Sequence, residues 1–173
     1  MNMMNKRSLV ASLFMFMMVS STWAQSDSAD SVPAHTTQDV RFIMAASAAG
    51  QTEILASRMV ASHSQSPNVQ SFAQTMIDDH TKANDALLAL AKKDGYNISS
   101  TPTEAQESAL SQLEPLKGAD FDKAYAAMMV KDHRAAVSLF ESETTSGTNS
   151  DIKNFAAQTL PVVQHHLTMA NAL

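Results

Sequence analysis

The sequence predicts an all-α protein whose long helices form a four-helix bundle. Apolar residues recur at helical spacing after residue 37, and no segment shows sustained alternation rich in β-branched residues. Only four Gly occur, and Gly95, Gly118 and Gly147 lie between the periodic segments. Four long helices and one short helix favour a bundle. The helices are expected at residues 38–64, 67–94, 102–114, 119–146 and 150–172.

Two of the expected helices begin at a proline. Pro67 and Pro102 each follow a Ser or Thr, which is the arrangement of an N-cap residue with Pro at the first helical position. Thr101 and Glu104 also have the spacing of a capping box. The segment 95–118 contains the short helix and is long for a simple hairpin. It is therefore expected to carry the chain back along the bundle, as the long crossover of ferritin-like folds does.

The start of the chain has the features of a secretory signal. Lys6 and Arg7 precede an apolar run at 9–19, and small residues at the −3 and −1 positions predict cleavage after Ala24. The run is short for a membrane span, so an uncleaved anchor is the weaker interpretation. The expected organisation is a signal peptide at 1–24, a flexible leader at 25–37 and a bundle domain at 38–173, located in the periplasm.

The composition excludes several classes of function. Without Lys6 and Arg7, the 12 Lys and Arg become 10 against 17 Asp and Glu, so nucleic-acid binding is not expected. The absence of Cys excludes disulfides, thiolate metal sites and a lipid anchor on an N-terminal Cys. After the signal no long apolar run occurs, so no membrane span is expected. No phosphate loop, nucleophile elbow or dinucleotide fingerprint occurs, so an enzyme is the least favoured interpretation. It stays open because histidines can act as general bases in acid–base or hydrolytic chemistry.

A short pattern occurs twice and puts a histidine on the buried face of two helices. Residues 76–80, Met-Ile-Asp-Asp-His, reappear at 129–133 as Met-Val-Lys-Asp-His. Apolar residues four before, three after and seven after each His lie on the same helical face. A polar residue in such a stripe must be hydrogen-bonded, paired or bound to a ligand. His80 and His133 are therefore candidate site residues.

The other two long helices each contribute one polar residue to the same kind of stripe. These residues are Glu53 in the first helix and His166 in the last. At about 1.5 Å rise per residue, Glu53 and the two repeated His lie about 20–22 Å from the starts of their helices, and His166 lies about 24 Å from its start. All four are therefore expected in one polar layer near the middle of the bundle.

Several segments together resemble a family of exported bacterial proteins. The segments are 72–84 (FAQTMIDDHTKAN), 127–133 (AMMVKDH), 159–161 (TLP) and 166–170 (HLTMA). They are similar to family 4142 of the domains of unknown function, and the resemblance covers about residues 38–172. It implies a ferritin-like fold and a periplasmic or outer-membrane location. It implies no particular activity.

The pattern departs from that of ferritin-like di-iron sites, which use Glu-x-x-His on two helices. The residues three positions before the stripe histidines are Ile77, Val130 and Val163. This argues against a carboxylate-bridged di-iron centre and the oxygen chemistry that such a centre performs.

Two main interpretations of the polar layer remain. In the first, Glu53 accepts hydrogen bonds from the imidazoles, and the network fixes helix pairing in a non-enzymatic protein with a structural or stress-related binding role. In the second, the layer binds one divalent transition metal or copper. The candidate ligands are Glu53, His80, His133 and His166. Asp79 and Asp132 are expected to accept hydrogen bonds behind the rings in either case.

Copper enters the second interpretation because of three methionines. Met76 and Met129 lie one turn before the repeated histidines, and Met169 lies three residues after His166. Soft thioethers favour Cu(I). Packing in the apolar core is the simpler role for each of these side chains.

Overall fold

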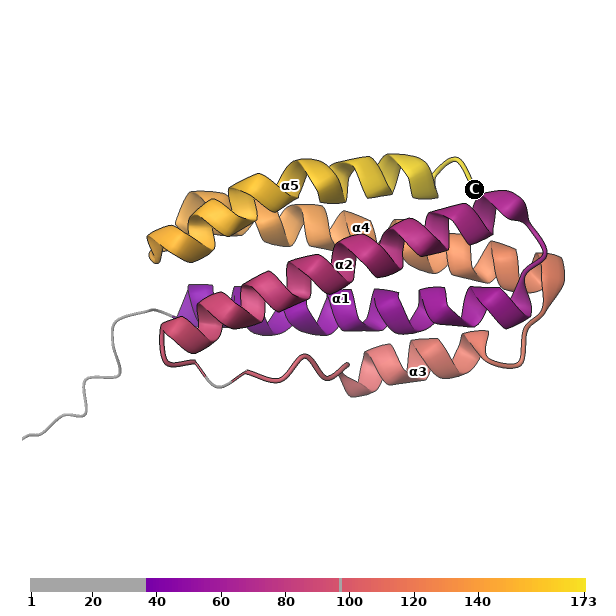
Figure 1. Ribbon diagram of the computed structural model, residues 1–173, viewed down its shortest axis with the longest axis horizontal. Coiled ribbons are helices and arrows are strands. Elements are labelled where there is room, and N and C mark those ends of the chain that lie inside the picture. Colours follow the sequence, from indigo (N-terminus) through magenta and orange to yellow (C-terminus); the bar gives the residue numbers. More distant parts are fainter. Residues whose placement is uncertain (1–36, 97) are drawn as a thin grey trace, which may run out of the picture. The chain divides into compact units, whose positions relative to one another are not determined.

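The structure is a computed structural model that describes residues 37–96 and 98–173 (Figure 1). Its helices are α1 (Thr37–His63), α2 (Pro67–Lys93), α3 (Glu104–Leu113), α4 (Gly118–Ser146) and α5 (Ser150–Ala170). No strand occurs in these two ranges, so the predicted all-α fold class is confirmed. The signal expected at 1–24 lies outside the described residues. No helix in the described part of the chain is long and apolar enough to cross a membrane.

The four long helices form the bundle. Helix α1 packs against α2 and α4, and α5 packs against α4 and α2. Short connections join α1 to α2 and α4 to α5, so each of these pairs is an antiparallel hairpin (Figure 1). Residues 98–117 run back along the bundle, and their helix α3 packs against α1 and α4. Helix α4 therefore runs parallel to α2, which is the crossover topology that the sequence predicted.

The start of α3 differs from the prediction. Thr103 is the N-cap residue: its backbone N–H donates to Gln106 Oε1 at 2.8 Å, and the Gln106 N–H donates to Thr103 Oγ1 at 3.4 Å. The capping box expected at Thr101 and Glu104 is therefore wrong by two residues. The Thr103–Gln106 pair satisfies two free backbone donors and leaves Pro102 outside the helix, where its missing N–H costs nothing.

The core consists of two apolar clusters with the polar layer between them. One cluster includes Phe72, Tyr125 and Met129. The other includes Phe42, Leu87 and Phe140. Along every long helix, the members of one cluster precede the polar layer residue and the members of the other follow it. The two clusters therefore hold the four helices in register on either side of the layer.

Candidate metal centre

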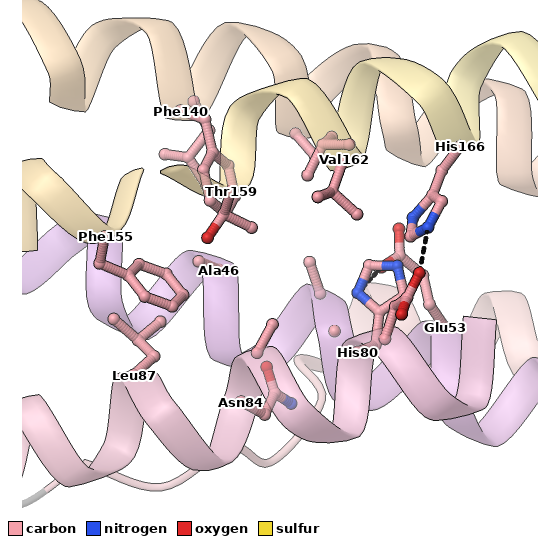
Figure 2. A pocket seen from close by; sticks show the side chains of 17 residues that line it. Ala46, Glu53, His80, Asn84, Leu87, Phe140, Phe155, Thr159, Val162 and His166 are labelled. Carbon is pink, nitrogen blue, oxygen red and sulfur yellow. Dashed lines mark hydrogen bonds and ion pairs between the residues drawn. The ribbon is translucent and has the colours of Figure 1, made fainter. Parts of the chain in front are cut away.

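The structure brings the four predicted layer residues together in the core. Glu53 and His166 are each 1% exposed, His133 is 0% exposed, and His80 is 9% exposed. The centroids of the three imidazole rings lie 5.3 to 5.5 Å apart. In Figure 2, Glu53, His80 and His166 lie at one end of a pocket. One residue from each long helix therefore reaches the same small volume.

Glu53 contacts two of the rings. His80 Nδ1 lies 3.2 Å from Glu53 Oε2, and His133 Nδ1 lies 3.5 Å from Glu53 Oε1. His133 Nδ1 also lies 2.9 Å from the backbone oxygen of Met129. A carbonyl oxygen only accepts, so His133 Nδ1 carries the hydrogen and its Nε2 carries the lone pair. The backbone oxygen of Met129, one helical turn before His133, therefore sets the tautomer of this ring.

The third ring is held from another helix. His166 Nε2 on α5 donates to Asp79 Oδ2 on α2 at 2.9 Å. The lone pair of His166 is therefore on Nδ1. Asp132 is the counterpart of Asp79 in the repeated pattern, yet it makes no hydrogen bond to any of the three rings among the described residues. Of the two aspartates expected behind the rings, only Asp79 has that position.

Each ring also has one nitrogen with no hydrogen-bond partner in the described structure. These atoms are His80 Nε2, His133 Nε2 and His166 Nδ1, and all three are buried. Each ring brings a nitrogen within 4.8 Å of nitrogens of the other two rings. A buried polar atom without a partner costs about 1–3 kcal/mol. Three such atoms in one layer destabilise the fold, so a purely structural role does not explain them.

Burial disfavours the charged forms of all four groups in the centre. Burial, together with the neighbouring His133 and His166, lowers the pKa of His80 to about 3. Burial lowers the pKa of His133 to about 4, against the hydrogen bond to Met129, which raises it. Burial also lowers the pKa of His166. Burial, followed by the charge of Asp132, raises the pKa of Glu53 well above its usual value. Because the His80 ring is neutral near pH 7, its close approach to Glu53 is not an ion pair.

The methionines that suggested copper lie in the apolar core. Met76 and Met129 are both 0% exposed and belong to the cluster that contains Phe72 and Tyr125. Met169 packs against the same cluster. Packing therefore accounts for these side chains without a metal.

Sequence reasoning missed a second buried polar group, near the start of α1. Asp39 accepts hydrogen bonds from the backbone N–H groups of Thr148 at 2.9 Å and Asn149 at 3.2 Å. Glu143 is 0% exposed and accepts from Gln38 Nε2 at 3.2 Å. Burial raises the pKa of Glu143 to about 7. Its position three residues beyond the last apolar member of the α4 stripe was the signal that could have identified it.

Two solved structures share this fold at low sequence identity. A DUF305 fragment from Deinococcus radiodurans has a TM-score of 0.69 and 17% identity, covering 81% of this chain and 97% of that chain. A DUF305 protein from Streptomyces coelicolor, described as secreted, has a TM-score of 0.67 and 16% identity, covering 77% and 88%. A comparison with curated proteins found no match. The model of DUF4142, a domain of unknown function, matches residues 24–173, so the chain belongs to the family that its motifs predicted.

Proposed function

We propose that this protein binds one late first-row transition-metal ion, copper or zinc, through three imidazoles at the centre of the bundle. His80 and His133 bind through Nε2, and His166 binds through Nδ1. One observation carries the proposal: each of these nitrogens is buried without a protein partner. The opposite nitrogen of each ring is held by a protein oxygen. This is the usual arrangement of a ligating histidine, whose second nitrogen is fixed by hydrogen bonding.

The geometry and the chemistry of the donor set are consistent with such an ion. Nitrogen ligands about 2.0–2.1 Å from a tetrahedral ion are about 3.3 Å from one another. The limit of 4.8 Å between ring nitrogens therefore requires ring movements of only about 1 Å on binding. The rings are neutral, which is the form that binds metals. A set of imidazoles suits copper and zinc, whereas magnesium, calcium and manganese prefer oxygen ligands.

Glu53 has a different role in this proposal from that of a fourth ligand. Its two oxygens face Nδ1 of His80 and Nδ1 of His133, on the sides of the rings opposite the proposed ligand nitrogens. Glu53 therefore orients the His80 ring and lies against the His133 ring, which the Met129 carbonyl oxygen holds. A dication in the centre favours its ionised form, since an opposite charge nearby lowers the pKa of a carboxyl group.

A hydrogen-bond network without an ion is the alternative function of the layer. The contacts of Glu53 and Asp79 support it, since they join all four long helices through side chains. They account for only one nitrogen of each ring, however, which is why we favour the metal site.

Titration of metal-free protein with Zn(II) and Cu(II), followed by calorimetry and thermal melts, tests the proposal. We expect one ion per chain and a stabilisation that grows with free metal, about 2.7 kcal/mol at 100 times the Kd. His133→Ala should abolish most of this gain. His165→Ala is the matched control, because this exposed residue directly precedes His166. A wild type that binds neither ion, or equal losses in the two variants, contradicts the proposal.

The repeated pattern supplies a second test with its own control. Asp79→Asn weakens the acceptor of the His166 N–H and should lower metal affinity by about 10–100-fold. Asp132→Asn makes the same chemical change at the equivalent position of α4, where no ring is bonded, and should lower affinity far less. Equal effects would show that Asp79 does not act through His166.

We also propose that the chain is exported to the periplasm with cleavage of residues 1–24. The basic and apolar pattern of that segment supports export, as does the likeness to a secreted protein. The mature protein should begin at Gln25. Since Trp23 is the one Trp of the sequence, the ultraviolet emission of the mature protein should come from Tyr96 and Tyr125. An intact mass that retains residues 1–24 on a membrane-bound protein contradicts this.

A further inference from the structure

A small cavity between α2 and α5 adjoins two of the three imidazoles, those of His80 and His166. It has about 40 Å³ of space for the centres of water-sized molecules. One water needs about 10–15 Å³ of such space, so the cavity holds about three water-sized units. Glu53, His80 and His166 line one end, and Leu87 and Phe155 line the other (Figure 2).

Small side chains create this space. Ala49, Gly50 and Ala83 line the cavity at positions where a bundle core usually carries larger apolar residues. Gly50 also leaves room for Asn84, because a Cβ at this position would lie 2.5 Å from Asn84 Oδ1. The Asn84 amide donates to the Ser47 carbonyl oxygen at 3.2 Å, which ties it to α1. The cavity is therefore bounded by side chains that are themselves held in place.

The cavity has a route to solvent between α2 and α5. Val162 on its lining is 39% exposed, and Ala83 and Thr159 are partly exposed. Most of the lining is apolar. A charged molecule that entered would lose its hydration without replacement, which is costly, whereas an uncharged one would lose little.

We propose that this cavity holds a small uncharged molecule, of about two to four non-hydrogen atoms, that binds the open position of the metal ion. The inference rests on the proposed metal site. Three histidine ligands leave a fourth position of a tetrahedral ion unfilled. Two of the three rings line the cavity, so a mostly apolar space adjoins that position.

Carbon monoxide and Cu(I)-loaded protein under anaerobic conditions test this inference. Carbon monoxide is a neutral diatomic donor, and the infrared stretch of the bound molecule reports its binding. We expect saturable binding of one molecule per copper. Ala83→Leu fills the cavity from α2 and should weaken binding at least tenfold while copper is retained. Ala86→Leu is the matched control on the same helix, because this exposed residue does not line the cavity.

Two further measurements keep the test decisive. If Ala83→Leu loses its helical circular dichroism, Thr159→Leu fills the cavity from α5 instead. Xenon binding to metal-free protein, followed by 129Xe NMR, probes the cavity without any ion, since dry apolar cavities bind xenon. We expect saturable xenon binding that the cavity-filling variant abolishes.

The outcomes separate the two proposals. Copper content is measured first, and a protein that binds no copper overturns the metal site and this inference with it. A protein that retains copper but binds no carbon monoxide overturns this inference alone. The same holds if metal-free wild type binds no xenon, or if carbon monoxide binds equally well when the cavity is filled.

Discussion

Glu143 gives a test of the structure that is independent of any ion. Its carboxyl group is 0% exposed at the end of the bundle where α1 begins. Burial, the hydrogen bond with Asp39 and the charge of Asp39 together raise its pKa to about 7. Burial alone would raise the pKa of Asp39 too, but its bonds from Thr148 and Asn149 lower it. The pair therefore titrates as one protonated acid beside one carboxylate near neutral pH.

The direction and size of the effect follow from proton linkage. The pKa of Glu143 rises from 4.5 to about 7 on folding, so between these values the folded chain holds a proton that the unfolded chain has lost. The free energy of unfolding must then fall as pH rises through this window and stay lowered above it. At about 1.4 kcal/mol per pH unit, the loss is at most about 3.5 kcal/mol, and solvent screening reduces it to roughly 2–3 kcal/mol. Glu143→Gln carries no ionisable group and should escape this loss.

Urea denaturation followed by circular dichroism at pH 4.5 and pH 8 measures the effect. We expect Glu143→Gln to be more stable than wild type by about 2–3 kcal/mol at pH 8 and nearly equal at pH 4.5. Glu141→Gln, two residues earlier and exposed, is the control and should stay within about 0.5 kcal/mol at both values. A Glu143→Gln effect that is independent of pH, or a destabilisation at pH 8, refutes the reasoning.

Two further predictions concern buried contacts, and urea melts measure both. Gly50→Ala should destabilise by about 1–3 kcal/mol, because the new Cβ meets Asn84 Oδ1 at 2.5 Å. In an Asn84→Ala background, Gly50→Ala should instead stabilise by about 0.8–1 kcal/mol, because helices favour Ala over Gly by this amount. A stability change of the same sign in both backgrounds contradicts this. Tyr125→Phe should cost about 1–3 kcal/mol, because Ser57 Oγ loses a buried partner at 2.7 Å. Adding Ser57→Ala should cost less than the sum of the single changes, whereas strict additivity counts against the bond.

The fold could be predicted from the sequence because its signals are local. Helical periodicity and the Gly residues between the helices predicted all five helices to within a few residues. The start of α3 was the exception, because Thr101 and Thr103 both have a capping partner three residues later and the sequence pattern does not rank them. Which of two adjacent caps forms depends on the chain geometry on both sides, which is not a local signal.

The candidate site could be predicted only in part. The depth of each polar residue along its helix predicted that Glu53 and the histidines would share one layer, because helical rise converts sequence position into height. The contacts behind the rings could not be predicted, since they depend on the rotation of each helix. Asp79 and Asp132 occupy the same place in the repeated pattern, yet only Asp79 reaches a ring on a neighbouring helix. The two repeated segments therefore make different contacts around the layer.

The position of the layer between two apolar clusters also determines how an ion affects the fold. In small zinc domains the ion replaces a missing core, so the metal-free chain unfolds. Here each cluster packs all four long helices without the layer residues. The three unpartnered ring nitrogens cost about 1–3 kcal/mol each, a cost that the two clusters must offset in metal-free protein. The metal-free protein should therefore keep its helical circular dichroism and a cooperative melt, and an ion should raise the midpoint of that melt rather than create the fold.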